Sequence, residues 1–256
     1  MMAAGRLVAL LFSFWAVIWV TACAPLPAEL PPAASGAARP EAGSLATLTV
    51  LYTNDEHGWM LGQEEGTGAA ELLGLWQSRH GYRQDDPHFL VLSGGDNWTG
   101  PAISTWFQGE SMVEVMNAMG YDATAIGNHE FDFGAEVLQE RIAQARFPFL
   151  SANLRDRASG AVPTDLGIRD YVILDLGDIR VGLIGLTTTL TPLTTNPTHV
   201  APFEFVPYEE ALREVVPKVR ADGADLILVP AHLCLGELMS LARSVRDLDI
   251  ALFGGG

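Results

Sequence analysis

Strand-like and helix-like segments alternate along the chain from Ala46 onward, and this alternation is the feature that most constrains the fold. Short apolar runs rich in β-branched residues predict strands, and longer segments with helical spacing predict helices. The predicted strands cover residues 46–55, 89–96, 122–129, 147–154, 170–177, 179–188, 225–232 and 248–255. The predicted helices cover residues 69–80, 111–120, 134–146, 208–223 and 237–247. Continuous apolar strands that alternate with helices indicate an α/β fold whose sheet is covered on both faces.

Two local features add detail to this pattern. The strands at residues 170–177 and 179–188 flank a Gly-Asp turn, which predicts that they pair as a β-hairpin. Pro217 lies inside the predicted helix at residues 208–223. Because proline lacks a backbone N–H and clashes with the preceding turn, we expect it to kink or end that helix.

The first 44 residues have the features of a targeting segment. A short basic start is followed by an uncharged, mostly apolar run at residues 7–20. This run is shorter than the roughly 20 residues that a membrane-spanning helix needs. It therefore predicts a secretory signal peptide at residues 1–22. Residues 23–44 are rich in Pro and Ala, which predicts a semi-extended linker with little apolar surface to bury.

Cys23 directly follows two small residues, Thr21 and Ala22, where the apolar run has ended. This arrangement resembles the cleavage box of bacterial lipoproteins. The resemblance implies lipidation of Cys23 and attachment to a membrane of the bacterial cell envelope, on its periplasmic or extracellular face. An ordinary signal peptide with an incidental cysteine is the alternative.

The charge of the chain limits its partners. With 31 acidic and 15 basic side chains, the formal charge is −16. Binding of a nucleic-acid polymer irrespective of sequence needs a basic surface, so the composition argues against that function. An acidic domain that handles phosphates would need bound cations to create a local positive site. No feature of the sequence indicates a protein partner.

Five polar residues lie at the C-terminal ends of four predicted strands or just beyond them. They are Asp55, His57, Asp96, Asn128 and His232. Ligands of open α/β folds bind at this edge of the sheet. Since all five side chains are of types that bind metal ions, the sequence predicts a metal site there.

Four segments carry a resemblance to a known family: LYTNDEHG (51–58), LSGGDNWTG (92–100), MNAMGYDATAIGNHEFDFG (116–134) and LVPAHLCLGE (228–237). In this order they resemble the signature blocks of calcineurin-like metallophosphoesterases. Within them, GNHEFDFG resembles the branch of 5′-nucleotidases and UDP-sugar hydrolases. The resemblance implies a sandwich of two β-sheets flanked by helices, with the catalytic domain at residues 45–256. It also implies hydrolysis of nucleotide phosphate esters through in-line attack by a metal-bound hydroxide.

The resemblance further implies two divalent metal ions, zinc, manganese or a similar metal, which clamp phosphoryl oxygens and activate a water molecule. Asp55 and His57 would bind the first ion. Asn128 and His232 would bind the second, and Asp96 would bridge the two.

Other residues of these segments would act around the ions. His129 would face the transition state, where it stabilises a phosphoryl oxygen or protonates the leaving group. Asp132 would accept a hydrogen bond from His129 and favour its charged form. Glu56 and Glu130 are expected to support the ligands from behind or to face solvent. Trp98 would either pack in the core or line the pocket.

The sequence departs from the family pattern at Gly256, its last residue. In the family a strand of this type continues into a Gly-His-x-His block, whose two histidines supply one further ligand to each metal. We therefore expect a C-terminally incomplete catalytic domain, a truncated part of a longer enzyme. Three other functions stay open at this point: a 2′,3′-cyclic nucleotide phosphodiesterase, a sulfur-oxidation thiosulfohydrolase and a catalytically inert lipoprotein fragment.

Overall fold

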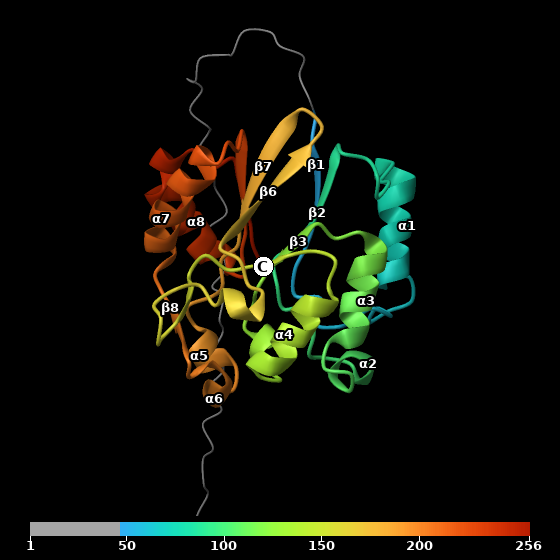
Figure 1. Cartoon of the computed structure of the whole chain (residues 1–256). Helices are drawn as coiled ribbons and strands as arrows, with labels where there is room; N and C mark the ends of the chain where they lie inside the picture. Colours follow the sequence, from blue (N-terminus) through green and yellow to red (C-terminus); the bar gives the residue numbers. More distant parts are fainter. Residues whose placement is uncertain (1–46) are drawn as a thin grey trace, which may run out of the picture.

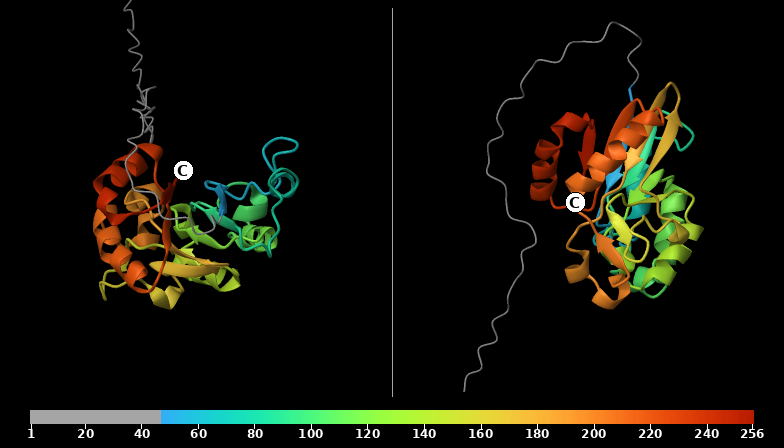
Figure 2. Two further views of the ribbon diagram at one scale, coloured as in Figure 1. Left: turned by 90° about the horizontal axis from the view of Figure 1, so that it is seen from above. Right: turned by 60° about the vertical axis from the view of Figure 1, so that its left-hand side comes forward.

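The computed structural model describes residues 47–256. The predicted signal peptide at residues 1–22, the linker at residues 23–44 and the lipidation site Cys23 lie outside the described residues. Two four-stranded sheets pack face to face at the centre, and helices lie on the outer side of each sheet (Figure 1 and Figure 2). The predicted α/β sandwich is therefore confirmed. Within residues 47–256, none of the helices is both long and apolar enough to cross a bilayer.

The first sheet is entirely parallel. Its strands, in spatial order, are β1 (Thr49–Thr53), β2 (Phe89–Ser93), β3 (Ala123–Ala125) and β4 (Phe149–Leu150). The helices that connect these strands are α1 (Ala69–His80), α2 (Ala102–Thr105), α3 (Glu110–Met119) and α4 (Ala135–Gln144). A short 3₁₀ turn, η1 (His129–Phe131), lies between β3 and α4. Because the strands are parallel, their carboxyl ends meet at one edge of the sheet.

The second sheet is mixed. Its strands, in spatial order, are β10 (Leu252–Gly254), β9 (Leu226–Pro230), β7 (Ile179–Ile184) and β6 (Tyr171–Leu176). Strands β6 and β7 pair antiparallel, which confirms the predicted hairpin, whereas β7, β9 and β10 are parallel to one another. The longer helices of this half are α7 (Tyr208–Ala221) and α8 (Leu235–Ser244).

The remaining elements of the described residues are short. They are β5 (Leu154–Asp156), η2 (Thr164–Leu166), α5 (Thr191–Thr194), α6 (Pro197–Val200), β8 (Phe203–Phe205) and η3 (Arg246–Leu248). Strands β5 and β8 form a two-stranded antiparallel sheet that the sequence did not predict.

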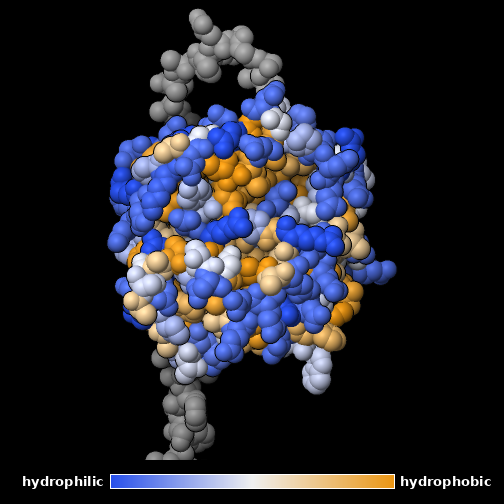
Figure 3. Space-filling model, in the orientation of Figure 1, coloured by the Kyte–Doolittle hydropathy of each residue, from blue (hydrophilic) through white to orange (hydrophobic). Residues whose placement is uncertain are grey.

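Apolar side chains from both sheets fill the space between them. Leu90 and Leu92 of β2 belong to one buried cluster with Val181 and Leu183 of β7. A second cluster lies between the first sheet and its helices, and a third lies between the second sheet and its helices. The outer surface is mostly hydrophilic in the view of Figure 3, with hydrophobic residues concentrated over the middle of that face. This layered core fixes the strand ends of the two sheets relative to one another.

Pro217 was expected to kink or end its helix, and the second of these outcomes is wrong. Helix α7 continues through Pro217 to Ala221. Pro217 is exposed, so the carbonyl group that it leaves without an N–H partner can bond to water. On the opposite side of α7, Val215, Val216 and Val219 are buried and hold the helix against the sheet.

Candidate metal centre

The loops after β1 and β2 have strained backbones at three of the predicted ligands. Asp55, His57 and Asp96 have φ angles of 53°, 45° and 55°. Residues other than glycine rarely adopt this left-handed region, and such strain is concentrated at functional sites. The loops are tied together, because the N–H of Asp55 bonds to the carbonyl of Gly95 and that of His57 to the carbonyl of Asp96.

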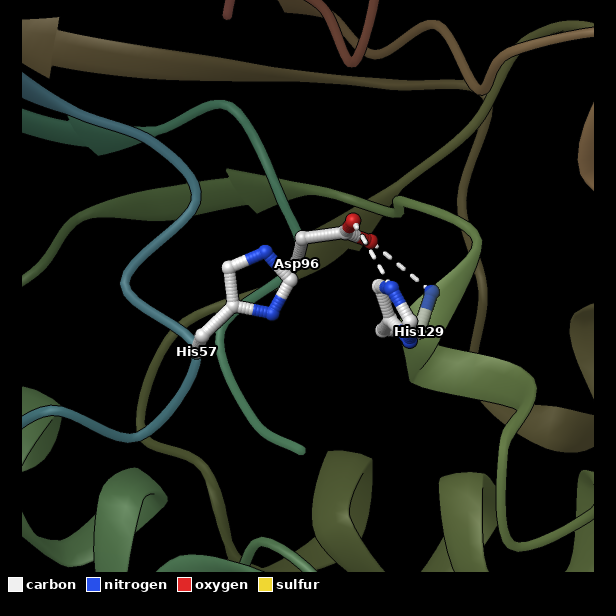
Figure 4. A group of neighbouring side chains, drawn as sticks. All are labelled: His57, Asp96 and His129. Carbon is white, nitrogen blue, oxygen red and sulfur yellow. Dashed lines mark hydrogen bonds and ion pairs between the residues drawn. The ribbon is translucent and has the colours of Figure 1, made fainter. Parts of the chain in front are cut away.

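Asp96 lies at the centre of the cluster and is 3% exposed. Its Oδ1 accepts the backbone N–H of His129 at 2.8 Å. Its Oδ2 lies 3.1 Å from Nε2 of His232 and 3.9 Å from Nε2 of His129. Figure 4 shows His57, Asp96 and His129 converging from three separate loops, with Asp96 directed at His129. The carboxylate of Asp96 is therefore within reach of ligands from both halves of the molecule.

The potential ligand atoms form two groups that share Asp96. One group contains His57, Asp96 and His129, and the other contains Asp55, Asp96 and His232, with the atoms of each group within 4.8 Å of one another. The sequence instead assigns Asp55 and His57 to the same metal ion. In the structure these two side chains form an ion pair at 3.6 Å. In either division Asp96 is the shared member, as expected of a bridging carboxylate.

All five predicted ligands and His129 line one cavity of about 360 Å³. Nδ2 of Asn128 donates to the carbonyl of Thr194 at 3.5 Å, so its amide oxygen is the atom available to a cation. Nδ1 of His57 lies 3.2 Å from the carbonyl of Thr99, which leaves Nε2 available in the same way. The structure thus brings the predicted ligands together.

The donor set fits a divalent metal ion. Nδ1 of His232 is buried and has no hydrogen-bond partner among the described residues. An unpaired buried nitrogen is costly, and a bond to Nδ1 itself, such as a metal–ligand bond, would satisfy it. Carboxylate, imidazole and amide groups together suit zinc or manganese.

In the absence of metal, the neighbouring carboxylates raise the pKa of two of the predicted ligands, His57 and His232. The interaction with Asp55 raises the pKa of His57, and the same interaction lowers the pKa of Asp55. Burial alone would lower the pKa of His232, but the carboxylates of Asp96, Glu130 and Asp55 together raise it. A metal ion binds the neutral imidazole, so protons compete with the ion and metal binding weakens as the pH falls.

His129 is paired with Asp132 in a separate arrangement. Nδ1 of His129 and Oδ2 of Asp132 are 2.6 Å apart. This hydrogen bond raises the pKa of His129 to about 9, so the imidazole carries a proton on both nitrogens at neutral pH. Burial alone would raise the pKa of Asp132, but its hydrogen bonds with His129 and Thr195 lower it. The geometry agrees with the hydrogen bond that the sequence predicted for this pair.

Glu130 was only loosely interpreted from the sequence, which left it either behind the ligands or in solvent. It is 1% exposed. Its carboxylate accepts the backbone N–H groups of Asp96, Asn97 and Gly127 at 2.9, 2.8 and 2.6 Å, and Nδ2 of Asn97 at 3.1 Å. Glu130 therefore connects the loops after β2 and β3 from behind the ligands, and the solvent-facing alternative is wrong.

Three further residues have roles that sequence patterns define poorly. Gly127 is needed because a Cβ there would lie 2.1 Å from Oδ1 of Asp96. Trp98 is fully buried in the core and does not line the pocket, which decides between its two alternatives. Thr195 donates a hydrogen bond from Oγ1 to Oδ1 of Asp132 at 2.7 Å. The contact with Thr195 spans 63 positions in the sequence, and no local signal predicts it.

No family model matches the chain. The sandwich and its strand-end cluster nevertheless define a class of protein. The calcineurin-like phosphoesterase YfkN of Bacillus subtilis superimposes with a TM-score of 0.69 at 25% identity, covering 82% of this chain and 71% of that one. The fold is therefore that of a calcineurin-like phosphoesterase.

Relatives in sequence narrow this class. A snake venom 5′-nucleotidase of Gloydius brevicauda is 35% identical over 219 residues, which are 81% of this chain and 36% of the relative. A 5′-nucleotidase of Vibrio cholerae is 37% identical over 196 residues, which are 75% of this chain and 35% of the relative. The chain belongs to the 5′-nucleotidase family of calcineurin-like metallophosphoesterases. It spans little more than a third of the length of these relatives.

Proposed function

We propose that the protein is a metal-dependent hydrolase of nucleotide phosphate esters of the 5′-nucleotidase type. The observation that carries the proposal is the shared carboxylate of Asp96, which belongs to both potential ligand groups in one cavity. His129, already protonated through Asp132, lines the same cavity. The names of the two relatives support a nucleotide as the substrate and favour a 5′-monoester over a cyclic diester.

Each residue has a part in this reaction. Asp55, His57, Asp96, Asn128 and His232 would hold two divalent ions, which when bound polarise phosphoryl oxygens and lower the pKa of a coordinated water.

His129 would direct its protonated Nε2 toward the phosphate, either to bond a phosphoryl oxygen or to give its proton to the leaving oxygen. Asp132 keeps that proton available at neutral pH, because its carboxylate stabilises the charged imidazole. The carboxylates of Asp55 and Asp96 line the cavity and repel an anion, so bound cations would be needed to offset their charge when a phosphate enters.

We further propose that the protein is secreted to the bacterial cell envelope and anchored by a lipid on Cys23. The apolar run at residues 7–20 and the position of Cys23 directly after Thr21 and Ala22 support this. Expression in a bacterial host should place the protein in the membrane fraction, and Cys23→Ala should release it from that fraction. Equal partitioning of both forms would contradict the anchor.

Release of inorganic phosphate from adenosine 5′-monophosphate tests the enzymatic proposal. The purified protein should release phosphate with Mn²⁺ or Zn²⁺ and not with EDTA. Asn128→Ala should lower the rate at least as much as the roughly 10- to 100-fold that loss of a supporting partner costs. Asn117→Ala is the matched control, because its amide lies on α3 and contacts Gln144 and Arg146. A folded, metal-binding protein that released no phosphate would be the inert alternative.

A further inference from the structure

The segment formed by α5 and α6 contacts the loop that carries His129 at three points. The carbonyl of Thr194 accepts from Asn128, and the Thr195 hydroxyl donates to Asp132. Nδ1 of His199 lies 3.0 Å from the carbonyl of Phe131. This segment follows β7 of the second sheet, whereas the His129 loop follows β3 of the first. The contacts therefore join the two halves of the sandwich beside the cavity.

The Thr195 contact engages the remaining oxygen of Asp132. Oδ2 of Asp132 faces His129 at 2.6 Å and Oδ1 faces Thr195 at 2.7 Å. A carboxylate held at both oxygens is restrained from rotating, and so is the imidazole bonded to it. Thr195 directly follows α5 and is itself held in place, because its backbone N–H bonds to the carbonyl of Thr191, the first residue of that helix.

We infer that Thr195 is a positioning residue for the His129–Asp132 pair. It holds the carboxylate of Asp132, which in turn holds the ring of His129 at the angle from which Nε2 reaches the cavity. Thr195 does not touch the reacting atoms. The kinetic part of this inference rests on the proposed function; the structural part does not.

The inference predicts a dependence on the leaving group. In the second of its two proposed roles, His129 is the acid for the leaving group: a water oxygen bonds to phosphorus, the bond from phosphorus to the ester oxygen breaks, and His129 gives its proton to that ester oxygen. The proton that the attacking water loses then restores the charged form of His129. The alkoxide of a nucleoside needs this proton, whereas nitrophenolate is stable enough to leave without it. A misplaced His129 should therefore slow a nucleoside monophosphate more than nitrophenyl phosphate.

Three variants form the test. Thr195→Val removes the hydroxyl while keeping the shape, and Thr195→Ser restores a hydroxyl. Thr198→Val is the matched control, since the exposed Thr198 hydroxyl in the same segment bonds to Asn196. With Mn²⁺, Thr195→Val should lower kcat on adenosine 5′-monophosphate about 3- to 10-fold, the range of one lost hydrogen bond, with KM unchanged. The loss on nitrophenyl phosphate should be under about 2-fold, and the Ser variant should recover most of the activity.

A spectroscopic readout separates this inference from the proposed function. The test follows the Nδ1–H proton of His129 by NMR in the metal-free protein, where its signal would be assigned by its loss in His129→Asn. Thr195→Val should shift it or broaden it by exchange with water, whereas Thr195→Ser and Thr198→Val should leave it unchanged. An unchanged signal in Thr195→Val would overturn the inference, as would equal losses on both substrates. If the wild-type protein hydrolyses neither substrate, the proposed function fails and the NMR signal alone decides the role of Thr195.

Discussion

Replacing Gly127 with alanine should disrupt the site through a single steric contact. The added Cβ would lie 2.1 Å from Oδ1 of Asp96 and 2.7 Å from its backbone nitrogen, whereas ordinary contact begins at 3.4 Å. The Asp96 carboxylate must therefore move by more than 1 Å or the backbone must shift. Either movement breaks the 2.8 Å hydrogen bond from His129 to Oδ1. The φ of Gly127 is not positive, so backbone strain does not contribute.

The expected effect of Gly127→Ala has two parts. Overpacking a well-filled site typically costs about 1–3 kcal/mol of the free energy of unfolding. A displacement of about 1 Å at a catalytic group costs on the order of 10²-fold in rate. Urea denaturation in EDTA measures the first part, and phosphate release with Mn²⁺ measures the second.

Gly74→Ala is the matched control for this variant. Gly74 is exposed on α1, and no described atom outside its own helix neighbourhood lies within 4 Å of the added Cβ. Because glycine is unfavourable inside a helix, alanine should stabilise the protein there by about 0.5–1 kcal/mol. If Gly127→Ala matched the wild type in stability, metal binding and rate, the close packing of Gly127 on Asp96 would be refuted.

Three further changes test the surroundings of Asp96. Glu130→Gln puts an amide NH₂ against two of the N–H groups that the carboxylate accepts, so it should lower the free energy of unfolding by about 2–5 kcal/mol. Urea denaturation measures this loss, and an unchanged midpoint would contradict the role of Glu130. The pKa of His129 in the folded protein, about 9, lies above its ordinary 6.5, so the charged imidazole beside Asp132 stabilises the folded state. In the metal-free protein this stabilisation should be present in full below pH 6.5 and should be lost as the pH rises through 9. Asp132→Asn should abolish that loss, as followed by unfolding at several pH values; a slope that persisted would assign it to another group. Mn²⁺ at about 100 times its Kd should raise the free energy of unfolding by about 2.7 kcal/mol, and EDTA should reverse this gain. Thermal unfolding measures it, and Asp96→Ala should remove it.

The fold and the ligand cluster could be predicted because both depend on local patterns. Apolar strands that alternate with helices imply parallel pairing, and parallel strands bring their carboxyl ends to one edge. Asp55, Asp96 and His232 each follow such a strand, so their meeting in one cavity required no knowledge of long-range contacts. The order of the four family segments then indicated the class of protein.

The supporting contacts could not be predicted, because they depend on how distant loops meet. Glu130 accepts bonds from residues 33 and 34 positions away, and Thr195 reaches Asp132 across 63 positions. Neither contact leaves a periodic signal in the sequence. The continuation of α7 through Pro217 was missed for a related reason, since the burial of its valine side depends on the tertiary packing rather than on helix propensity.

The central claim is that one cluster of strand-end residues holds two metal ions that share Asp96. Anomalous X-ray diffraction from Mn²⁺-soaked crystals tests it most directly. The account predicts two peaks about 3.5–4 Å apart, with the carboxylate of Asp96 between them. A single peak that Asp96 does not contact, or no peak in the cavity at saturating Mn²⁺, would contradict the account.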